Sequence, residues 1–427
     1  MNKEMNTMRE TKYWRRRILW TAWITYAGFY LARTNMSIAL PVIMDEYGIS
    51  KVAMGGILTS LFAFYAVGQF VNGQLGDKFG SRNLIAVGIL GSVSLNIAFG
   101  FSDGVLIAMI AIWGLNGYFQ SMGWGPSVKL VANWFPRRER GKAAGILGTS
   151  YQIGNAASWA LAGLVIGQLG WRWGFWIPSI LFALLGLHWF IRARNVPEEV
   201  GLPTIEQQDT EENNTATIKK DYHLGFRYTL KHTLLNPKVW IVGFGLFFLN
   251  IVRYGFLSWA PTYMFEVQKA AISTAAFKAI AFPLAGSLGA LSAGWFSDKF
   301  FGSRRAPLAV IMLFLLAGFI GLYPHVSNGM LSLVCLMVIG FLTFGPHMIM
   351  VTAMPMELGT RKAASSVTGF IDGLGYVGAA ITGVGTGWLL DTFNWNAAFY
   401  FWLIAAIIAA GLMLLLWNYK PEKSEYQ

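Results

Sequence analysis

Two arginines and one aspartate interrupt long apolar stretches of this 427-residue chain. Arg33 lies within GFYLARTNMSIALP, Arg253 within LFFLNIVRYGFLSWAPTY, and Asp372 within SSVTGFIDGLGYVG. A charged side chain in a membrane-spanning helix is costly, so it normally faces a cavity or a partner and marks function. A guanidinium stays protonated and offers a planar fork of donors that fits phosphate or carboxylate. These residues predict an anion site; the alternative is a structural arginine that binds helix carbonyls.

Further polar side chains share the helical faces of the two arginines. Tyr30 lies three residues before Arg33, and Asn250 lies three residues before the second arginine. Residues at this spacing are neighbours on one face of a helix. Both side chains are therefore predicted either to line the same cavity or to bind a buried carbonyl.

Asp372 leaves several roles open. It could pair with an arginine while the site is empty, carry a coupling proton, or bind a cationic group of the substrate. A neutral, protonated carboxyl is the alternative without a function. The internal repeat described below aligns this aspartate with Gln152, which follows Tyr151 in the chain. We therefore include these two residues in the candidate site.

The composition indicates that the elements around these residues lie in a membrane. Apolar residues make up 55% of the chain and charged residues only 13%, whereas soluble domains contain about 25% charged residues. A soluble enzyme, a disordered chain and a disulfide-stapled secreted domain are therefore excluded. One span needs about 20 apolar residues. The sequence predicts twelve spans in two sets of six: 18–39, 53–76, 83–101, 105–128, 143–168, 173–192, 238–265, 273–297, 306–326, 330–354, 363–390 and 395–418.

The basic residues that give the net charge of +12 are distributed unevenly around these spans. The side that holds both termini carries 27 Lys and Arg, the opposite side carries four, and two lie within spans. Because basic loops stay in the cytoplasm, we expect a multi-pass protein of the cytoplasmic (inner) membrane with both termini cytoplasmic. A nucleic-acid surface is not expected, since the charges lie in short loops beside helix ends.

The two sets of spans repeat each other. GKAA at 141–144 recurs as RKAA 220 residues later, and Arg33 and Arg253 are also 220 residues apart. The pattern G-x-x-x-DKF, which begins at Gly73, recurs at an offset of 221. The sequence therefore predicts a duplicated unit with three parts: an N-terminal six-helix half at 1-192, a cytoplasmic linker at 193-236 and a C-terminal six-helix half at 237-427.

The loop after the second span and its repeat carry a second group of candidates. NGQLGDKFGSR closely resembles the loop 2–3 signature of major facilitator transporters. Its glycines let helices approach closely, and Asp77 can cap a helix N-terminus or pair with a basic loop residue. We expect gating and structural roles, rather than substrate contact, for six residues: Gly73, Asp77, Lys78, Arg82, Asp298 and Lys299.

Four motifs resemble the organophosphate:phosphate antiporter family of the major facilitator superfamily. They are YLARTN around Arg33, GYFQSMGWGP at 117–126, WFPRRERG at 134–141 and RYGFLSWAPTY at 253–263, with GWFSDKFFGSRR at 294–305 in support. The resemblance covers nearly the whole chain apart from the termini and the linker. It implies an all-α membrane protein with the major facilitator fold. In that fold, twelve transmembrane helices form two six-helix halves related by pseudo-two-fold symmetry, with the substrate site between them.

The resemblance also implies exchange of an organic phosphate, such as glycerol 3-phosphate or a hexose 6-phosphate, for inorganic phosphate by alternating access. Arg33 and Arg253 would then be the phosphate-binding arginines. The chain departs from well-known members at two positions. It has Gln69 where they carry a lysine in span 2, and Tyr151 where glycerol-phosphate carriers have a histidine in span 5. We therefore expect a phosphorylated or phosphonylated substrate with a different organic part, zwitterionic ones included.

Two other classes of function remain open. The chain could be a transporter-like membrane sensor of a phosphorylated metabolite, or a proton-coupled symporter of another organic anion that uses Asp372. An enzyme is not expected, because no nucleophile–base pair, metal set or Walker motif appears. No cofactor is predicted, and the expected partners are a small phosphorylated anion, inorganic phosphate and the bilayer. The protein is predicted to be a monomer.

Overall fold

The chain is almost entirely helical. The computed structural model describes residues 2–205, 235–302, 304–326, 329–358 and 364–419, and within these ranges it contains helices and turns and no β-strand. The all-α class predicted from the sequence is therefore confirmed.

Contacts divide the chain into two units, and each is described by itself. Unit 1 comprises Met1–Ala39 and Phe64–Asp221, and unit 2 comprises Leu40–Ala63 and Tyr222–Gln427. A stretch from the predicted N-terminal half therefore clusters with the C-terminal half. The division at 193–236 into two six-helix halves stays a prediction.

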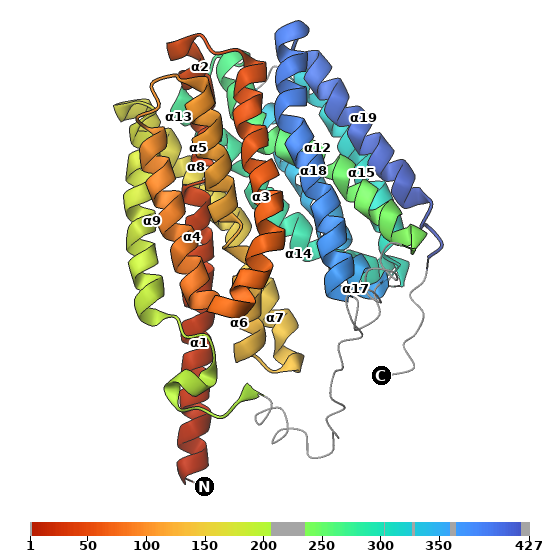
Figure 1. Cartoon of the computed structure of the whole chain (residues 1–427). Coiled ribbons are helices and arrows are strands. Elements are labelled where there is room, and N and C mark those ends of the chain that lie inside the picture. Colours follow the sequence, from red (N-terminus) through yellow and green to blue (C-terminus); the bar gives the residue numbers. More distant parts are fainter. Residues whose placement is uncertain (1, 206–234, 303, 327–328, 359–363, 420–427) are drawn as a thin grey trace. The chain divides into compact units, whose positions relative to one another are not determined.

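Unit 1 is built around α1 (Figure 1). Its helices, with the two that continue into unit 2, are α1 (Asn2–Leu31), α2 (Asn35–Tyr47), α3 (Lys51–Phe79), α4 (Ser81–Phe99), α5 (Leu106–Gln120), α6 (Trp124–Trp134), α7 (Arg137–Gly148), α8 (Ser150–Leu169), α9 (Trp173–Arg192) and the short 3-10 turn η1 (Pro197–Val200). The helix α1 packs against α8 and α9, and α4 packs against α5 and α9.

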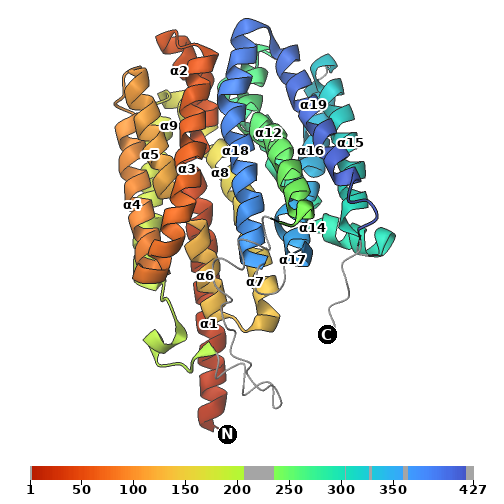
Figure 2. The ribbon, with the colours of Figure 1, turned by 45° about the vertical axis from the view of Figure 1, so that its right-hand side comes forward.

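Unit 2 contains the helices from α12 onward (Figure 2). They are α12 (Pro237–Glu266), α13 (Ile272–Ala279), α14 (Ala281–Phe301), α15 (Arg305–Leu322), η2 (Tyr323–His325), α16 (Gly329–Met348), the π-helical turn η3 (Ile349–Ala353), α17 (Met354–Leu358), α18 (Ala364–Thr392) and α19 (Trp395–Leu414). The helix α12 packs against α18 and α19, and α15 packs against α16 and α19. By order of the predicted spans, α12, α15, α16, α18 and α19 correspond to α1, α4, α5, α8 and α9. The pairings named for the two units therefore match, which supports a duplication.

The repeated loop motif places a glycine with positive φ at the same position in both units. Gly80 has φ 79° and ψ 153°, whereas Gly302 has φ 57° and ψ 47°, so the two differ in ψ but both need a positive φ, which favours glycine. In each case the glycine ends one long helix, α3 or α14, just before the next long helix begins. In unit 1 a Cβ on Gly80 would also crowd Asn195, whose Oδ1 accepts from the backbone N–H of Arg82 at 2.9 Å.

Nine stretches of the described residues are long and apolar enough to cross a membrane. The expected spans 18–39, 105–128 and 143–168 are not among the nine. In each of these three stretches the structure has two helices separated by a short break, at residues 32–34, 121–123 and 149. The first of these breaks contains a predicted site residue.

Candidate substrate site

Arg33 lies in the break between α1 and α2. Residues 32–34 form a turn, where the sequence predicts a continuous span. A break in a helix leaves carbonyl groups without their usual donors, and inside a bilayer each of these groups needs another partner. Discontinuous helices of this kind provide ligand contacts near the middle of transporter spans.

Buried side-chain amides satisfy the carbonyl of Ala32. It accepts hydrogen bonds from Asn96 Nδ2 at 3.0 Å, Asn116 Nδ2 at 2.9 Å and Gln120 Nε2 at 3.4 Å. Two residues further along the chain, the carbonyl of Thr34 accepts a hydrogen bond from Trp159 Nε1 at 3.1 Å. Helices α4, α5 and α8 thus hold the break in place from three sides and fix the backbone of Arg33.

The guanidinium of Arg33 contacts an amide and two aromatic rings. Its Nε donates to Gln120 Oε1 at 3.0 Å, and its Cζ lies 5.1 Å from the ring centre of Tyr30 and 4.9 Å from that of Tyr65. Gln120 therefore binds both the side chain of Arg33 and the carbonyl of Ala32. These contacts orient the guanidinium and leave its positive charge in place.

Replacement of Asn116 by leucine is expected to destabilise unit 1 by about 1–3 kcal/mol, the usual cost of removing one partner from a buried hydrogen bond. The amide of Asn116 is fully buried, and it donates to the broken helix at Ala32. Thermal unfolding of the purified protein in detergent would measure the change. Asn83→Leu is the matched control, because this exposed amide on α4 donates to the carbonyl of Phe79 at the end of α3. Equal melting temperatures for both variants would contradict the role given to Asn116.

Tyr151 joins an aromatic cluster that reaches Arg33 through Tyr30. Its ring centre lies 4.6 Å from that of Trp124, 5.4 Å from Tyr26 and 6.3 Å from Tyr30. The two remaining candidates of this unit lie on neighbouring helices. Gln69 is half-buried on α3, one turn after Tyr65 and on the same face, and Gln152 is buried on α8.

Arg253 lies in the middle of an unbroken helix, α12. Its side chain is only 8% exposed, and its Nη1 contacts His347 Nε2 at 3.0 Å and the hydroxyl of Tyr254 at 3.5 Å. Its Cζ also lies 4.9 Å from the ring centre of Tyr254 and 5.1 Å from that of Phe344. As in unit 1, these contacts are with neutral polar and aromatic groups. The local backbone, however, differs between the two repeats.

The contact with Arg253 defines the tautomer of His347. A guanidinium has no acceptor, so Nε2 must accept the hydrogen bond and the ring proton must lie on Nδ1. His347 is buried, and its Nδ1 has no hydrogen-bond partner among the described residues. The imidazole therefore acts as a neutral acceptor that fixes the direction of the guanidinium fork.

Asn250 and Asp372 both lie near Arg253. Asn250 is one turn earlier on α12 and 1% exposed, and its Oδ1 has no hydrogen-bond partner within the described ranges. Asp372 is half-buried on α18, close enough for its charge to interact with that of Arg253. Unit 2 thus brings an arginine, a free amide oxygen and a carboxylate together. Every predicted residue of this unit's site lies in that region.

The loop candidates act in helix–helix contacts. In unit 1, Arg82 donates through Nε and Nη2 to the carbonyl of Phe190 at 3.1 and 2.6 Å, which links α4 to the end of α9. Lys78 is exposed, with its Nζ 5.4 Å from the ring of Phe79. Gly73 and Asp77 lie on α3, and the side chain of Asp77 is outside what the structure describes.

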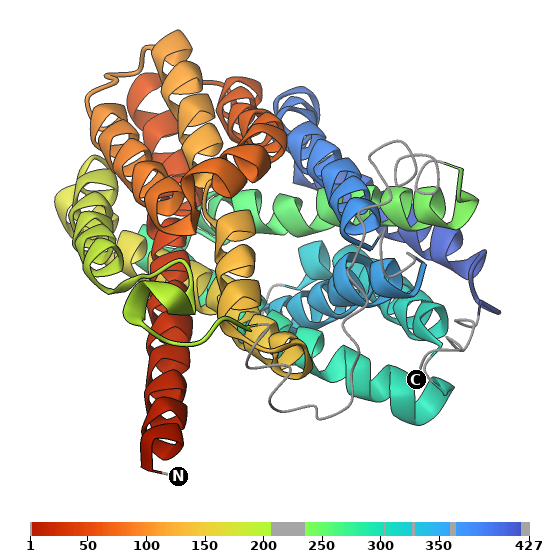
Figure 3. The same ribbon diagram turned by 60° about the horizontal axis from the view of Figure 1, so that its bottom comes forward.

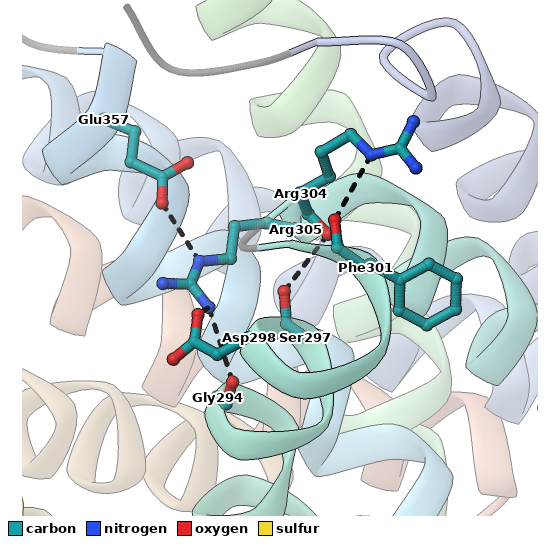
Figure 4. A network of polar contacts seen from close by, with 7 residues as sticks. All are labelled: Gly294, Ser297, Asp298, Phe301, Arg304, Arg305 and Glu357. Carbon is teal, nitrogen blue, oxygen red and sulfur yellow. Dashed lines mark hydrogen bonds and ion pairs between the residues drawn. The ribbon is translucent and has the colours of Figure 1, made fainter. Parts of the chain in front are cut away.

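In unit 2, Arg305 lies between two carboxylates (Figure 4). Its Nη1 is 2.8 Å from Asp298 Oδ1 on α14, and its Nε is 3.0 Å from Glu357 Oε1 on α17. Asp298, the repeat counterpart of Asp77, thus pairs with a basic residue, while the pairing expected of Asp77 itself stays a prediction. Lys299 instead packs its Nζ over the ring of Trp295 at 4.5 Å. Burial raises the pKa of the Glu357 carboxyl above its usual value, and Arg305 opposes that rise.

Replacement of Arg305 by glutamine is expected to lower the melting temperature more at about pH 7.5 than at about pH 5. The ionised form of Glu357 is penalised by burial, so its contribution to stability falls as pH rises from the unfolded pKa through the raised folded pKa. Without Arg305 this penalty grows at neutral pH. It disappears at low pH, because the carboxyl is then protonated in both states. Arg304→Gln is the matched control, since Arg304 donates only to the Phe301 carbonyl among the contacts in Figure 4. A pH-independent loss would contradict the ion-pair explanation.

Several residues around the arginines were not predicted. Gln120, Tyr65 and Tyr254 lie inside the motifs or runs quoted above, but nothing in those motifs distinguishes them from their neighbours. The amides of Asn96 and Asn116 carry a clearer signal, because buried amides in apolar helices need partners. Among the described residues, no group of three or more His, Cys, Asp or Glu side chains could hold a metal ion.

The sequence comparisons define the class of protein. Residues 22–383 match the Major Facilitator Superfamily, and the chain belongs to that superfamily. A bacterial homologue of the human lysosomal transporter Spinster, solved in an inward-facing and occupied conformation, has the same fold. The two structures match with a TM-score of 0.77 and 14% sequence identity, and the match covers 96% of this chain and 99% of the homologue's chain.

The curated relatives place the chain in the organophosphate:phosphate antiporter group of this superfamily. The probable hexose phosphate transport protein of Chlamydia trachomatis is 32% identical over 96% of this chain and 92% of that protein. The membrane sensor protein UhpC of Escherichia coli is 33% identical over 95% and 93%. The glycerol-3-phosphate transporter of Bacillus subtilis is 32% identical over 92% and 90%. The chain is therefore an integral, multi-pass membrane protein of a transporter family and not an enzyme, as the sequence predicts.

Proposed function

We propose that this protein carries an organic phosphate across the cytoplasmic membrane in exchange for inorganic phosphate, and that Arg33 and Arg253 bind the phosphate group. Relatives along almost the whole chain are named as hexose phosphate and glycerol-3-phosphate transporters. The proposal includes alternating access of two halves, both termini in the cytoplasm and a monomeric state.

One observation carries the proposal: each unit contains an arginine that contacts aromatic rings and a neutral acceptor, Arg33 at the break between α1 and α2 and Arg253 within α12. Gln120 accepts from Arg33, and His347 accepts from Arg253. Neutral acceptors orient a guanidinium without cancelling its charge, so the fork remains suited to a phosphate dianion. Two such forks would supply the two charges that the dianion needs.

The side chains near the arginines support a substrate whose organic part differs from that of the best-known carriers. In unit 1 the candidate groups besides Arg33 are the phenol of Tyr151 and the amides of Gln69 and Gln152, none of which is cationic. Near Arg253, Asn250 Oδ1 is a free acceptor for a hydroxyl, and Asp372 adds a carboxyl group. A phosphate ester that also bears hydroxyl or ammonium groups fits this set best.

Competition for phosphate uptake tests the proposal. Purified protein would be reconstituted into liposomes loaded with inorganic phosphate, and uptake of labelled phosphate would be measured against a panel of sugar, glycerol, amino-alcohol and phosphonate compounds. We expect at least one phosphorylated or phosphonylated compound to compete at lower concentration than phosphate itself. Failure of every such compound, while unphosphorylated organic anions compete, would contradict the proposal.

Two observations favour other candidates. The similarity to the UhpC sensor supports a sensor of a phosphorylated metabolite, which would bind its ligand without moving it. The proximity of Asp372 to Arg253 supports a proton-coupled symporter. Ligand binding without any counterflow would favour the sensor. Uptake into liposomes that contain no phosphate, driven by a pH gradient and lost in Asp372→Asn, would favour the symporter.

A further inference from the structure

A basic groove runs along one face of the N-terminal part of α1. Its volume is about 630 Å³, and its walls come from α1 and from the end of α9, both in unit 1. Figure 3 views the molecule from the end where the N-terminus lies, and there α1 (red) extends beyond the other helices of its unit. We call this hollow the α1–α9 groove.

The charges in the α1–α9 groove all have one sign. Within the described part of the chain, its lining includes no acidic residue. The basic side chains that line it come from α1 and α9: Arg9, Lys12, Arg16, Arg17, His188 and Arg192. Arg9, Lys12 and Arg16 are spaced by three and four residues, so they form a stripe on one face of α1, and Arg17 adjoins this stripe. Such a concentration of positive charge is costly to hold together and attracts an anion.

Two buried nitrogens in the groove lack protein partners. Arg17 Nε and His188 Nδ1 are inaccessible to solvent and have no hydrogen-bond partner among the described residues. The Arg17 guanidinium also stacks over Trp14 at 4.5 Å, which fixes its plane. Buried polar nitrogens normally have partners. Arg17 Nε is a donor in every state, and His188 Nδ1 is a donor in one tautomer, so an acceptor-rich group from outside the protein would complete this site.

The groove changes from basic to apolar along its length. Going along α1, the basic stripe ends at Arg17, and the same wall continues with Trp20 and Ile24, which are 52% and 38% exposed. The predicted first span begins at residue 18, so the basic part lies at the depth of lipid headgroups and the apolar part at the depth of acyl chains. Tryptophan is enriched at that boundary.

We propose that the α1–α9 groove binds an anionic phospholipid, with its phosphate among Arg16, Arg17 and Arg192 and one acyl chain along Trp20 and Ile24. Basic clusters beside membrane helices bind anionic headgroups in this way. A free phosphate has no apolar part that could contact Trp20 and Ile24, so the apolar end of the groove favours a lipid over a free phosphate. Arg9 and Lys12 lie closer to the N-terminus than Arg16 and Arg17. They could bind the part of the lipid headgroup beyond the phosphate, where that part is charged or carries hydroxyl groups.

Native mass spectrometry of the purified full chain tests this proposal. The protein would be titrated with phosphatidylglycerol and with phosphatidylcholine, and the apparent affinity of each lipid would be measured. We expect phosphatidylglycerol to bind more tightly. The double variant Arg16→Gln, Arg192→Gln is expected to bind it about 30-fold more weakly, because each basic contact with an anionic lipid contributes about 1 kcal/mol, or about fivefold.

Two controls keep the result specific to the groove. The double variant Lys238→Gln, Lys269→Gln removes the same charge from exposed lysines of unit 2 that do not line the groove, and its affinity should stay within about twofold of the parent, since exposed charges outside the binding site are screened. The deacylated headgroup glycerophosphoglycerol should not compete at the same concentrations. Equal affinity for the two lipids, equal losses in both double variants, or full competition by the free headgroup would each overturn the proposal. Unchanged melting temperatures would show that both double variants are folded.

Discussion

Replacement of Arg253 by lysine is expected to reduce phosphate uptake by roughly 100-fold in a protein that still folds. Lysine keeps the positive charge and loses the planar fork, so a two-point contact with phosphate becomes a single point contact. Loss of hydrogen bonds to a charged group costs about 1.5–3 kcal/mol each, which is about a 10- to 150-fold effect. Initial rates in phosphate-loaded proteoliposomes would measure the change.

The corresponding change at Arg33 should have an effect of similar size, because the repeat predicts an equivalent role for both arginines. Arg172→Lys is the matched control: Arg172 is also an arginine of unit 1, but it pairs with the exposed Asp103 at 3.1 Å. Uptake by this control should equal that of the parent protein. Full activity in either Arg33→Lys or Arg253→Lys would exclude fork-like phosphate recognition at that position.

Replacement of His347 by leucine is expected to raise the KM for phosphate about tenfold and to change kcat much less. His347 Nε2 accepts from Arg253 Nη1 at 3.0 Å and so positions the guanidinium without being assigned a substrate contact of its own. Leucine leaves a buried, charged donor without this acceptor, at a cost of about 1.5–3 kcal/mol. Transport rates over a range of phosphate concentrations would separate KM from kcat.

Two variants distinguish positioning by His347 from simple packing. His347→Gln retains an acceptor, so it should restore a KM within about threefold of the parent value if the neutral hydrogen bond is what matters. His325→Leu removes a histidine at the end of η2 and should leave KM unchanged. If glutamine and leucine at position 347 give the same KM, the acceptor role is wrong.

The sequence predicts the fold well, because membrane spans have a strong and simple signal. Twenty apolar residues in a row admit few structures in a bilayer, where every backbone group needs an internal partner. The offset of 220 residues between Arg33 and Arg253 likewise anticipates the matching helix pairs of the two units. The assignment of Leu40–Ala63 to unit 2 could not be predicted, since it depends on packing between segments far apart in the chain.

The local environment of the arginines could be predicted only in part. Tyr30 and Asn250 follow from helix periodicity, and their positions beside the arginines agree with it. Residues 32–34, where the helix breaks, include no glycine or proline, the residues that usually indicate a break in a sequence. The break depends instead on Asn96, Asn116 and Gln120, which come from other helices and meet only at the carbonyl of Ala32. The sequence shows His347 only as a histidine in or near a predicted span, and nothing in it predicts the contact with Arg253.

Counterflow of labelled phosphate tests the central claim most directly. Liposomes that contain the protein would be loaded either with inorganic phosphate or with an equal concentration of chloride, without a pH gradient, and placed in labelled phosphate. An exchanger that binds phosphate through Arg33 and Arg253 should accumulate label only in phosphate-loaded liposomes and should lose this accumulation in Arg253→Lys. Equal accumulation under both loading conditions, or accumulation that survives Arg253→Lys unchanged, would contradict the account.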